Sequence, residues 1–342
     1  MLLNLYNSFA ANNTKKAEIA VEYGCAKKVL RADRALEKRF PASLTKVMTL
    51  YLLFKAISEK KVSFNTRFKV SKFAVRQPPS KLGLKVGEKI MVSDLIKAMV
   101  VKSANDAAVV VAEGLCGSVS KFCLLMNRMA IKLGMVKTHF ENPSGLPDAR
   151  QITCAKDIAV LGMALYRDFP QYWHFLSLKS FKYRNQTHMT HCKILKWYKG
   201  TDGGKTGFTN ASGYNLLVTA EKFNKFGRSK RVFVVVFGGN TSKTRDLCAA
   251  HLLNSCLKDY NICSTSKAKD VLHTVRKHKS LSRQIEKADK STLEETIFEL
   301  DSVAVSEILK SNEVDQYQLD KLYENEEGVV QIIEEGIVFH KK

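Results

Sequence analysis

Residues 204–239 read GKTGFTNASGYNLLVTAEKFNKFGRSKRVFVVVFGG. Three β-rich segments lie in this stretch, GKTGFT (204–209), GYNLLVTAEKF (213–223) and KRVFVVVFGG (230–239), and only short turns separate them. Strands joined by such short links pair antiparallel with their neighbours along the chain. The stretch therefore predicts three antiparallel strands of one sheet.

Two further strands are predicted near the N-terminus, where AEIAVEY (17–23) and KKVLRAD (27–33) flank Gly24. Between the two groups of strands, apolar residues recur at helical spacing. The first expected helix is 43–60, capped by Ser43, and two more lie within 92–117, where Ser93 caps the first and KSAND (102–106) separates the two. The next helix is 118–134, which Gly134 ends. Another is capped by Thr153 and runs towards Pro170, and the last is 244–259. This order predicts an α+β fold, an antiparallel five-stranded sheet packed with helices plus a helical subdomain.

Charge divides the chain into a cationic body and a C-terminal part of different composition. The chain has 55 Lys and Arg against 33 Asp and Glu, a net charge of +22. Residues 264–342 hold 12 basic and 16 acidic residues, so the part before them has a net charge of +26. We expect a signal-peptide remnant or loose N-terminus (1–16), a main domain (17–263) and a charged, mainly helical or partly disordered appendage (264–342).

A cationic surface could meet nucleic acid, anionic lipid or an anionic polymer such as cell wall, and a general lysine bias of the proteome would give the same charge. No zinc-finger spacing, aromatic-rich nucleic-acid motif or helix-turn-helix pattern stands out, so nucleic acid is not an expected partner. The eight cysteines form no CxxC pair, and HMTHC (188–192) has no carboxylate or further His at ligand spacing. We therefore expect no metal and no other cofactor.

No run of residues approaches 18 apolar side chains, so no transmembrane helix is predicted. The N-terminal MLLNLYNSFAANN (1–13) is too short for a complete signal peptide and lacks a basic region, although it ends in small residues that resemble a cleavage site. A signal truncated by a misplaced start codon and an ordinary loose N-terminus both account for this pattern.

Three short motifs stand in order along the body. Six Ser-x-x-Lys pairs occur in the chain, and serine commonly caps helices, so one pair alone has little chemical meaning. However, Ser43 and Lys46 in FPASLTKVMTL (40–50) are followed after 60 residues by Ser103-Ala104-Asn105 and after another 102 by the single Lys-Thr-Gly, residues 205–207. The three motifs are predicted at a helix start, a break between helices and a strand. This ordered trio is the signature of penicillin-binding proteins and serine β-lactamases.

Longer stretches around the motifs resemble D-alanyl-D-alanine carboxypeptidases, the low-molecular-mass penicillin-binding proteins. They are PASLTKVMTLYLLF, VVKSANDAAVVVAEG, FENPSGLPD, DGGKTGFTNASGYNLLVTA and VVVFGGNTSKTRD, and the resemblance runs from about Ala17 to Asp259. It implies a β-lactamase/transpeptidase-like fold and a serine hydrolase that removes the terminal D-alanine of peptidoglycan stem peptides and is acylated by penicillins. Such a substrate implies a periplasmic or extracytoplasmic location.

The residue types fit an acyl-serine reaction. Ser43 Oγ would attack the carbonyl between the two D-alanines, and a free hydroxyl needs a base to do so. Lys46 lies one helical turn on and on the same face, so its amine can reach Oγ, and burial near a second cation such as Lys205 would keep that amine neutral. By resemblance, Ser103 would relay the proton to the leaving amine, and the backbone N–H groups of Ser43 and Phe208 would form an oxyanion hole.

The remaining motif positions are expected to bind substrate. By resemblance, Asn105 would hold the substrate amide, while Lys205 and Thr206 would bind the terminal carboxylate. Gly207 would let the peptide lie along the strand without meeting a Cβ. Arg245 resembles a carboxylate-binding arginine that follows the last strand; a solvated helix residue is its alternative.

The sequence also departs from the family. The segment before Lys-Thr-Gly usually carries an NRNxLL-like stretch, and here it reads THCKILK (190–196). The family's C-terminal β-domain and amphipathic membrane anchor are not recognisable in residues 264–342, so membrane attachment is not carried over.

Three other functions stay open at this point. A serine β-lactamase would need a deacylating base, for which Glu141 is the candidate, and class A enzymes of that kind carry Ser-Asp-Asn where this chain has Ser-Ala-Asn. A non-catalytic penicillin-binding or wall-binding module would keep the acylation site without turnover. A basic nucleic-acid binder rests on net charge alone.

Overall fold

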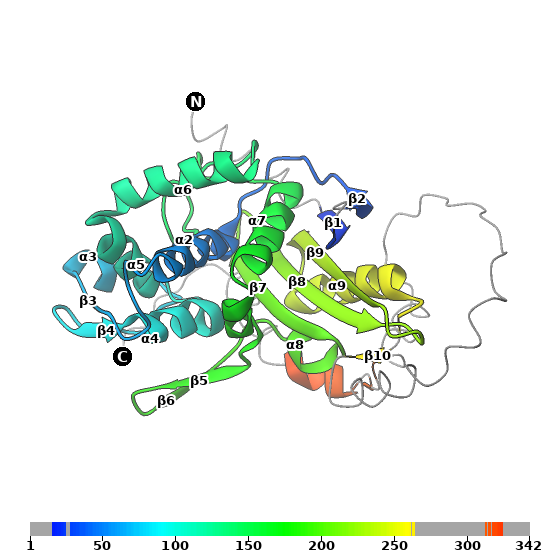
Figure 1. Ribbon diagram of the computed structural model, residues 1–342. Coiled ribbons are helices and arrows are strands. Elements are labelled where there is room, and N and C mark those ends of the chain that lie inside the picture. The colour runs from blue at the N-terminus through cyan, green and yellow to red at the C-terminus, as the bar shows by residue number, and fades with distance from the viewer. Residues whose placement is uncertain are drawn as a thin grey trace.

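The computed structural model describes residues 16–24, 28–260 and 262–263, and in the C-terminal part residues 312, 314–315 and 317–323. The expectations for residues 1–15 and for most of 264–342 lie outside these ranges. The described body has an open antiparallel sheet beside a group of helices (Figure 1). The predicted α+β class is confirmed.

The sheet contains the five predicted strands. They follow one another across it as β2 (Val29–Asp33), β1 (Ala17–Glu22), β9 (Ser229–Gly239), β8 (Gly213–Phe223) and β7 (Thr201–Thr209), and every neighbouring pair is antiparallel. A two-residue strand that the sequence analysis did not predict, β10 (Ile262–Cys263), pairs with the end of β8 at Phe223 and Lys222. Because β7 pairs with β8 only as far as Ala220, β10 occupies the edge that β7 leaves open.

The sheet separates two hydrophobic cores, and β9 contributes to both because successive side chains of a strand point to opposite faces. Phe233, Val235 and Phe237 join the larger core, which includes α2 (Lys46–Ser58) and α7 (Ala155–Asp168). Val232, Val234 and Val236 join the smaller core, which α9 (Ser242–Leu257) covers. Figure 1 shows α7 and α9 on opposite sides of the sheet.

The helical region lies beside the β7 side of the sheet (Figure 1). Its elements are the 3₁₀ turn η1 (Ala42–Thr45), α2, α3 (Lys72–Val75), α4 (Val92–Lys97), the π-helical turn η2 (Ala98–Lys102), α5 (Asn105–Cys116) and α6 (Val119–Leu133). The remaining elements before β7 are the paired strands β3 (Arg67–Lys69) and β4 (Lys89–Met91), which α3 separates in the sequence, the hairpin β5–β6 (Ser180–Tyr183 and Gln186–Met189), the 3₁₀ helix η3 (Pro170–Ser177) and the short helix α8 (Ile194–Trp197). Strands of three or four residues are too short to give a readable alternation, so these two strand pairs were not predicted.

Tertiary contacts overrule three of the predicted helix caps. Ser43 lies inside η1 and makes no capping bond, because its Oγ faces Lys46. Ser93 lies inside α4, which starts directly after β4, and its N–H donates to Phe64 O. Cys154 is the residue before α7, while Thr153 pairs its backbone with Arg39 and its hydroxyl with Thr138.

The predicted limits of α6 are confirmed at both ends. Ser118 accepts a hydrogen bond from the N–H of Lys121, and Gly134 ends the helix in the left-handed conformation, with φ +79°. No single helix among the described residues is long and apolar enough to cross a membrane; α5 and α6 reach that length and composition only as a pair bent by 86°.

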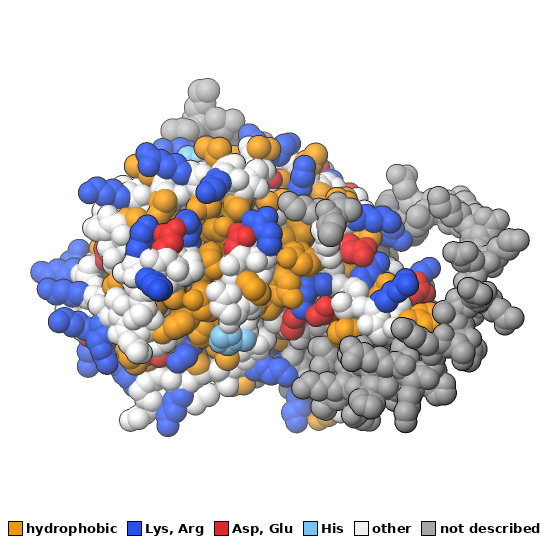
Figure 2. Space-filling view, viewed as in Figure 1, with side chains coloured by type: hydrophobic (Ala, Val, Ile, Leu, Met, Phe, Trp, Pro, Cys, Tyr) orange, Lys and Arg blue, Asp and Glu red, His pale blue; other side chains and the backbone are white. Residues whose placement is uncertain are grey.

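Lys and Arg side chains are spread over the face in Figure 2 and gather at the end of the helical region that holds α3, β3 and β4. The exposed cations of that end include Arg67, Lys69, Lys72, Lys85 and Lys89. The cationic body expected from composition therefore carries part of its charge far from the sheet.

The Ser118 cap gives a stability prediction. Ser118→Ala leaves an N–H at the start of α6 without its side-chain partner, so we expect the free energy of unfolding to fall by about 1 kcal/mol, as measured by urea denaturation. Ser120→Ala on the exposed side of the same helix is the matched control and should cost nothing, because alanine favours helix. Equal losses from the two variants would contradict the capping role.

Candidate active site

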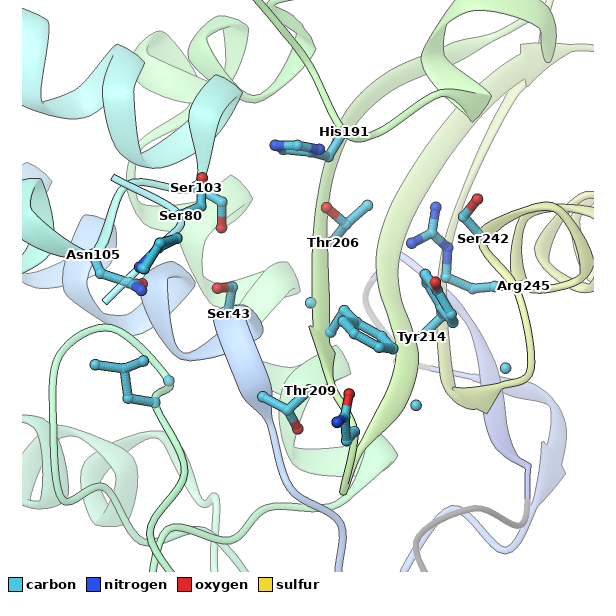
Figure 3. A pocket seen from close by; sticks show the side chains of 18 of the residues that line it. Ser43, Ser80, Ser103, Asn105, His191, Thr206, Thr209, Tyr214, Ser242 and Arg245 are labelled. Carbon is cyan, nitrogen blue, oxygen red and sulfur yellow. The ribbon is translucent and has the colours of Figure 1, made fainter. Parts of the chain in front are cut away.

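A cavity of about 1040 Å³ opens between β7 and the helical region, and Ser43 lies at its centre (Figure 3). Ser103 and Asn105 reach it from the helical side, while Thr206, Gly207 and Phe208 line it from β7. The structure thus brings the three sequence motifs into one site. Lys46 and Lys205 are fully buried beneath its surface.

The Lys46 amine sits among three oxygen atoms. Its Nζ lies 2.8 Å from Ser43 Oγ, 2.8 Å from Asn105 Oδ1 and 2.5 Å from the backbone oxygen of Ser144. The orientation of the Asn105 amide follows from its other end, because Nδ2 donates to Pro78 O at 2.9 Å. Oδ1 of Asn105 and the Ser144 carbonyl can only accept hydrogen bonds, so both require a hydrogen from Lys46.

This arrangement suits a neutral amine. A neutral amine has two hydrogens and one lone pair; once the hydrogens go to Asn105 and Ser144, the lone pair faces the hydroxyl of Ser43. Burial is the main cause that holds the pKa of Lys46 well below its usual 10.5, and the Lys205 cation acts in the same direction. The carboxylate of Asp106 opposes the shift. It accepts hydrogen bonds from the backbone N–H groups of residues 82–84.

Backbone contacts fix the turn that carries Ser43. Asn215 on β8 donates from Nδ2 to Phe40 O at 3.1 Å and accepts from the N–H of Gly238 with Oδ1, so it ties the turn to the sheet. Gly207 approaches the same turn: a Cβ there would lie 3.0 Å from Ser43 N and 3.1 Å from Pro41 O. The expected need for glycine at this position therefore arises from the nucleophile turn as well as from the open strand.

The loop 142–147 closes the site from the other side. Asn142 Oδ1 accepts from the backbone N–H groups of Ser144, Gly145 and Leu146, which folds the loop into a tight turn. Gly145 has φ +90°, and a Cβ there would lie 1.8 Å from Ala42 O. The turn that presents the Ser144 carbonyl to Lys46 is therefore pressed against the backbone of η1.

Ser103 and Lys205 form a second polar pair. Ser103 ends η2 in the left-handed conformation, with φ +59°. Lys205 Nζ donates to Ser103 Oγ at 2.8 Å and to Thr206 O at 2.7 Å. Burial lowers the pKa of Lys205 to about 7; Arg245 adds to the shift and Cys192 opposes it. Lys205 therefore titrates in the physiological range and reaches the cavity through Ser103.

Arg245 lies in the first turn of α9 and lines the cavity, so it is not the solvated residue that the sequence left as an alternative. It is 3% exposed, and its Nε donates to Asp246 Oδ1 at 2.8 Å. Its Nη2 lies 2.7 Å from the same oxygen without hydrogen-bond geometry, and has no hydrogen-bond partner among the described residues. A buried guanidinium nitrogen beside an open cavity is a ready donor for a bound anion.

Several lining residues were not predicted from the sequence. They are Pro79, Ser80, Lys81, Gly145, Leu146, Pro147, His191 and Tyr214. Phe208, which is 44% exposed, and Tyr214 place their rings 4.3 Å apart at one wall. The stretch FENPSGLPD was noted for its resemblance to the family, but nothing in its composition places it against Ser43. His191 falls in the segment where the sequence departs from the family pattern.

The sequence analysis also considered Glu141 as a deacylating base and the segment HMTHC (188–192) as a metal site. Glu141 pairs with His139 at 2.9 Å and Arg150 at 3.0 Å and is not among the residues that line the cavity. No group of three His, Cys, Asp or Glu side chains within the described ranges is placed to hold a metal ion. His188 packs its ring against Phe181, with centroids 5.3 Å apart.

The comparisons with known proteins point to one family. The model of the D-alanyl-D-alanine carboxypeptidase family Peptidase_S11 matches residues 7–241. The D-alanyl-D-alanine carboxypeptidase DacF of Bacillus subtilis is 30% identical over 76% of this chain and 66% of its own length. Penicillin binding protein 6B of Escherichia coli has a similar structure, with a TM-score of 0.65, 31% identity and coverage of 70% of this chain and 75% of its own.

A third relative was solved with a bound antibiotic. It is penicillin-binding protein D2 of Listeria monocytogenes in its cefotaxime-bound form, with a TM-score of 0.63, 27% identity and coverage of 70% of this chain and 96% of its own. The chain belongs to the D-alanyl-D-alanine carboxypeptidase family. It spans slightly less than two thirds of the length of the Bacillus relative.

The low pKa of Lys205 gives a prediction of pH dependence. Between about pH 7 and 10.5 the unfolded chain keeps the Lys205 proton and the folded chain does not, so this group makes stability rise with pH. We expect the unfolding free energy of the wild type minus that of Lys205→Met to rise by up to about 1.4 kcal/mol per pH unit in that window. Parallel urea titrations would measure it, with the exposed Lys85→Met as control. A constant difference would contradict the lowered pKa.

Proposed function

We propose that this protein is a serine-type D-Ala-D-Ala carboxypeptidase that removes the terminal D-alanine from peptidoglycan stem peptides. The observation that carries the proposal is the position of the Lys46 amine, whose Nζ lies 2.8 Å from Ser43 Oγ and also contacts Asn105 Oδ1 and Ser144 O, so that as a neutral amine it can direct its lone pair at the hydroxyl. Family membership supports the choice of substrate. The three motifs lie within the proposed domain 17–263.

Acylation begins at Ser43. Its Oγ attacks the carbonyl carbon between the two D-alanines while Lys46 takes the hydroxyl proton. The carbonyl oxygen becomes negatively charged, and the backbone N–H groups of Ser43 and Phe208 stabilise it. Asn105 would hold the substrate amide with the second hydrogen of Nδ2, since Oδ1 contacts Lys46 and the other Nδ2 hydrogen goes to Pro78 O.

The leaving D-alanine needs a proton on its nitrogen. Ser103 Oγ lines the cavity and accepts a hydrogen bond from Lys205, so it can relay to the leaving amine the proton that Lys46 took from Ser43, which returns Lys46 to its neutral form. The C–N bond then breaks and an ester to Ser43 remains. Water hydrolyses this ester, with Lys46 again as the base.

The terminal carboxylate is bound at the β7 and α9 side of the cavity. Thr206 presents its hydroxyl there, and Arg245 has a nitrogen without a hydrogen-bond partner among the described residues. Lys205 is buried behind Thr206 and acts on the carboxylate through its charge. A bound carboxylate in turn favours the protonated form of Lys205, so substrate raises a pKa that is near 7 in the free protein.

Penicillins carry a strained amide carbonyl and a carboxylate at the positions of the scissile bond and the terminal carboxylate, so the same residues would bind them. The Listeria relative with cefotaxime bound supports this extension. Because the substrate is a wall peptide, we place the protein in the periplasm or otherwise outside the cytoplasm. Glu141, tied to His139 and Arg150, offers no base for the β-lactamase alternative.

The nucleophile can be tested against a matched serine. Ser43→Ala should abolish covalent labelling by a fluorescent penicillin, because no other hydroxyl lies beside Lys46 Nζ in the described site. Ser58→Ala removes another serine with a lysine three residues later and should label normally. Labelling that survives Ser43→Ala, or peptide mapping to a different serine, would refute the assignment.

Carboxylate recognition can be tested with a pair of substrates. A peptide ending in D-Ala-D-Ala with a free acid should be cleaved far faster than its terminal amide, since misplacing the reacting carbonyl by about an ångström costs on the order of a hundredfold in rate. Thr206→Val should shrink the ratio of the two kcat/KM values by removing the hydroxyl at constant shape. Equal rates on both substrates in the wild type would favour an endopeptidase instead.

A further inference from the structure

The described part of the C-terminal region packs against the body behind the cavity. Residues 317–323 are helical and lie near α8 and β10, where Figure 1 draws them in orange-red. Leu319 is fully buried in the core that α9 covers. Asn312 Oδ1 accepts from the N–H of Lys199 at 3.0 Å, and Asp320 pairs with Lys243 of α9.

Tyr323 extends this contact into a buried polar group. It is 3% exposed, and its hydroxyl accepts a hydrogen bond from Trp197 Nε1 at 3.2 Å and donates one to Asp246 Oδ2. Burial raises the pKa of Tyr323 well above its usual value, and the Asp246 carboxylate adds to the shift, so the hydroxyl keeps its proton. The Lys193 ammonium lies over the Tyr323 ring, 4.6 Å from its centroid.

The two carboxylate oxygens of Asp246 have different partners, Tyr323 and Arg245. Oδ2 accepts from Tyr323, and Oδ1 accepts from Arg245 Nε at 2.8 Å. Asp246 is fully buried, and a buried carboxylate oxygen without a donor is costly. The Tyr323 hydroxyl therefore fixes the rotation of the Asp246 carboxylate, and that carboxylate fixes the guanidinium of Arg245.

We propose that Tyr323, brought by the C-terminal segment 312–323, is a positioning residue for Arg245 and makes this segment part of the carboxylate-binding site. The proposal rests on the proposed function, in which Arg245 binds the substrate carboxylate. Arg245 and Asp246 are neighbours on α9, more than 70 residues before Tyr323 in the sequence. Residues that the sequence analysis assigned to an appendage thus contribute to substrate recognition.

Loss of the Tyr323 hydroxyl should impair the binding of one class of substrate. Without the Tyr323 hydroxyl, Asp246 Oδ2 loses this hydrogen bond, and the carboxylate is held less firmly in its present rotation. The guanidinium that depends on Oδ1 moves with it, and a small displacement at a binding group costs roughly tenfold to a hundredfold in rate. The loss should fall on substrates that have a free carboxylate and spare those that lack it.

The test is a set of full-length variants assayed on the free-acid and amide peptides. Tyr323→Phe removes one oxygen and keeps the packed ring; Tyr317→Phe, at a tyrosine on the same helix that is 71% exposed, is the matched control. We expect Tyr323→Phe to lower kcat/KM for the free acid roughly tenfold or more, mainly through KM, with little change for the amide and none in the control.

Arg245→Ala and the double variant complete a thermodynamic cycle. If Tyr323 acts through Arg245, adding Tyr323→Phe to Arg245→Ala should cause no further loss on the free acid. Additive losses, or equal losses on both peptides, would assign Tyr323 a general structural role and overturn the inference. If Arg245→Ala lowers the ratio of the free-acid to the amide kcat/KM and Tyr323→Phe does not, the inference alone fails. If Arg245→Ala leaves that ratio unchanged, the proposed carboxylate role of Arg245 fails, and the inference with it.

Discussion

The proposed reaction depends on a Lys46 amine that carries no extra proton. Two conditions achieve this together: the amine is fully buried, and it shares the interior with the Lys205 cation. The partners of Lys46 come from distant parts of the chain, since Asn105 lies 59 residues and Ser144 98 residues further along. The base is thus a product of the complete fold, because in an unfolded chain the same lysine is an ordinary cation at neutral pH.

The two lysines have different surroundings. Lys46 is close to the hydroxyl that must lose a proton, while Lys205 contacts the hydroxyl of Ser103, which is placed to give one. Lys205 has a pKa near 7, so its charge responds to what enters the cavity. In the proposed mechanism, an anionic substrate would favour the protonated form of Lys205, and that charge would favour the neutral form of Lys46. Substrate binding would therefore help to prepare the proposed base.

The sequence predicted the parts of the fold and the site that depend on local pattern. The five main strands have long β-rich runs with short turns, and the motif residues are recognisable by their type and spacing. The three caps at Ser43, Ser93 and Thr153 were wrong because each residue found a partner outside its own helix. The Ser144 carbonyl, Asn215 and Asp246 were missed because their roles arise from contacts between distant segments. A backbone oxygen leaves no signature in the side-chain sequence.

The contact between Gly145 and Ala42 limits which residues around Ser43 can carry a side chain. The two backbones meet so closely that no side chain fits between them, and Gly207 meets the same turn from β7. The position of Ser43 is therefore set by main chain on two sides, and a side chain at Gly145 or Gly207 would displace it. Side chains at the rim of the cavity, such as the exposed Phe208 and His191, do not meet this constraint. A site built in this way can acquire new preferences for peptides while the reaction it performs stays the same.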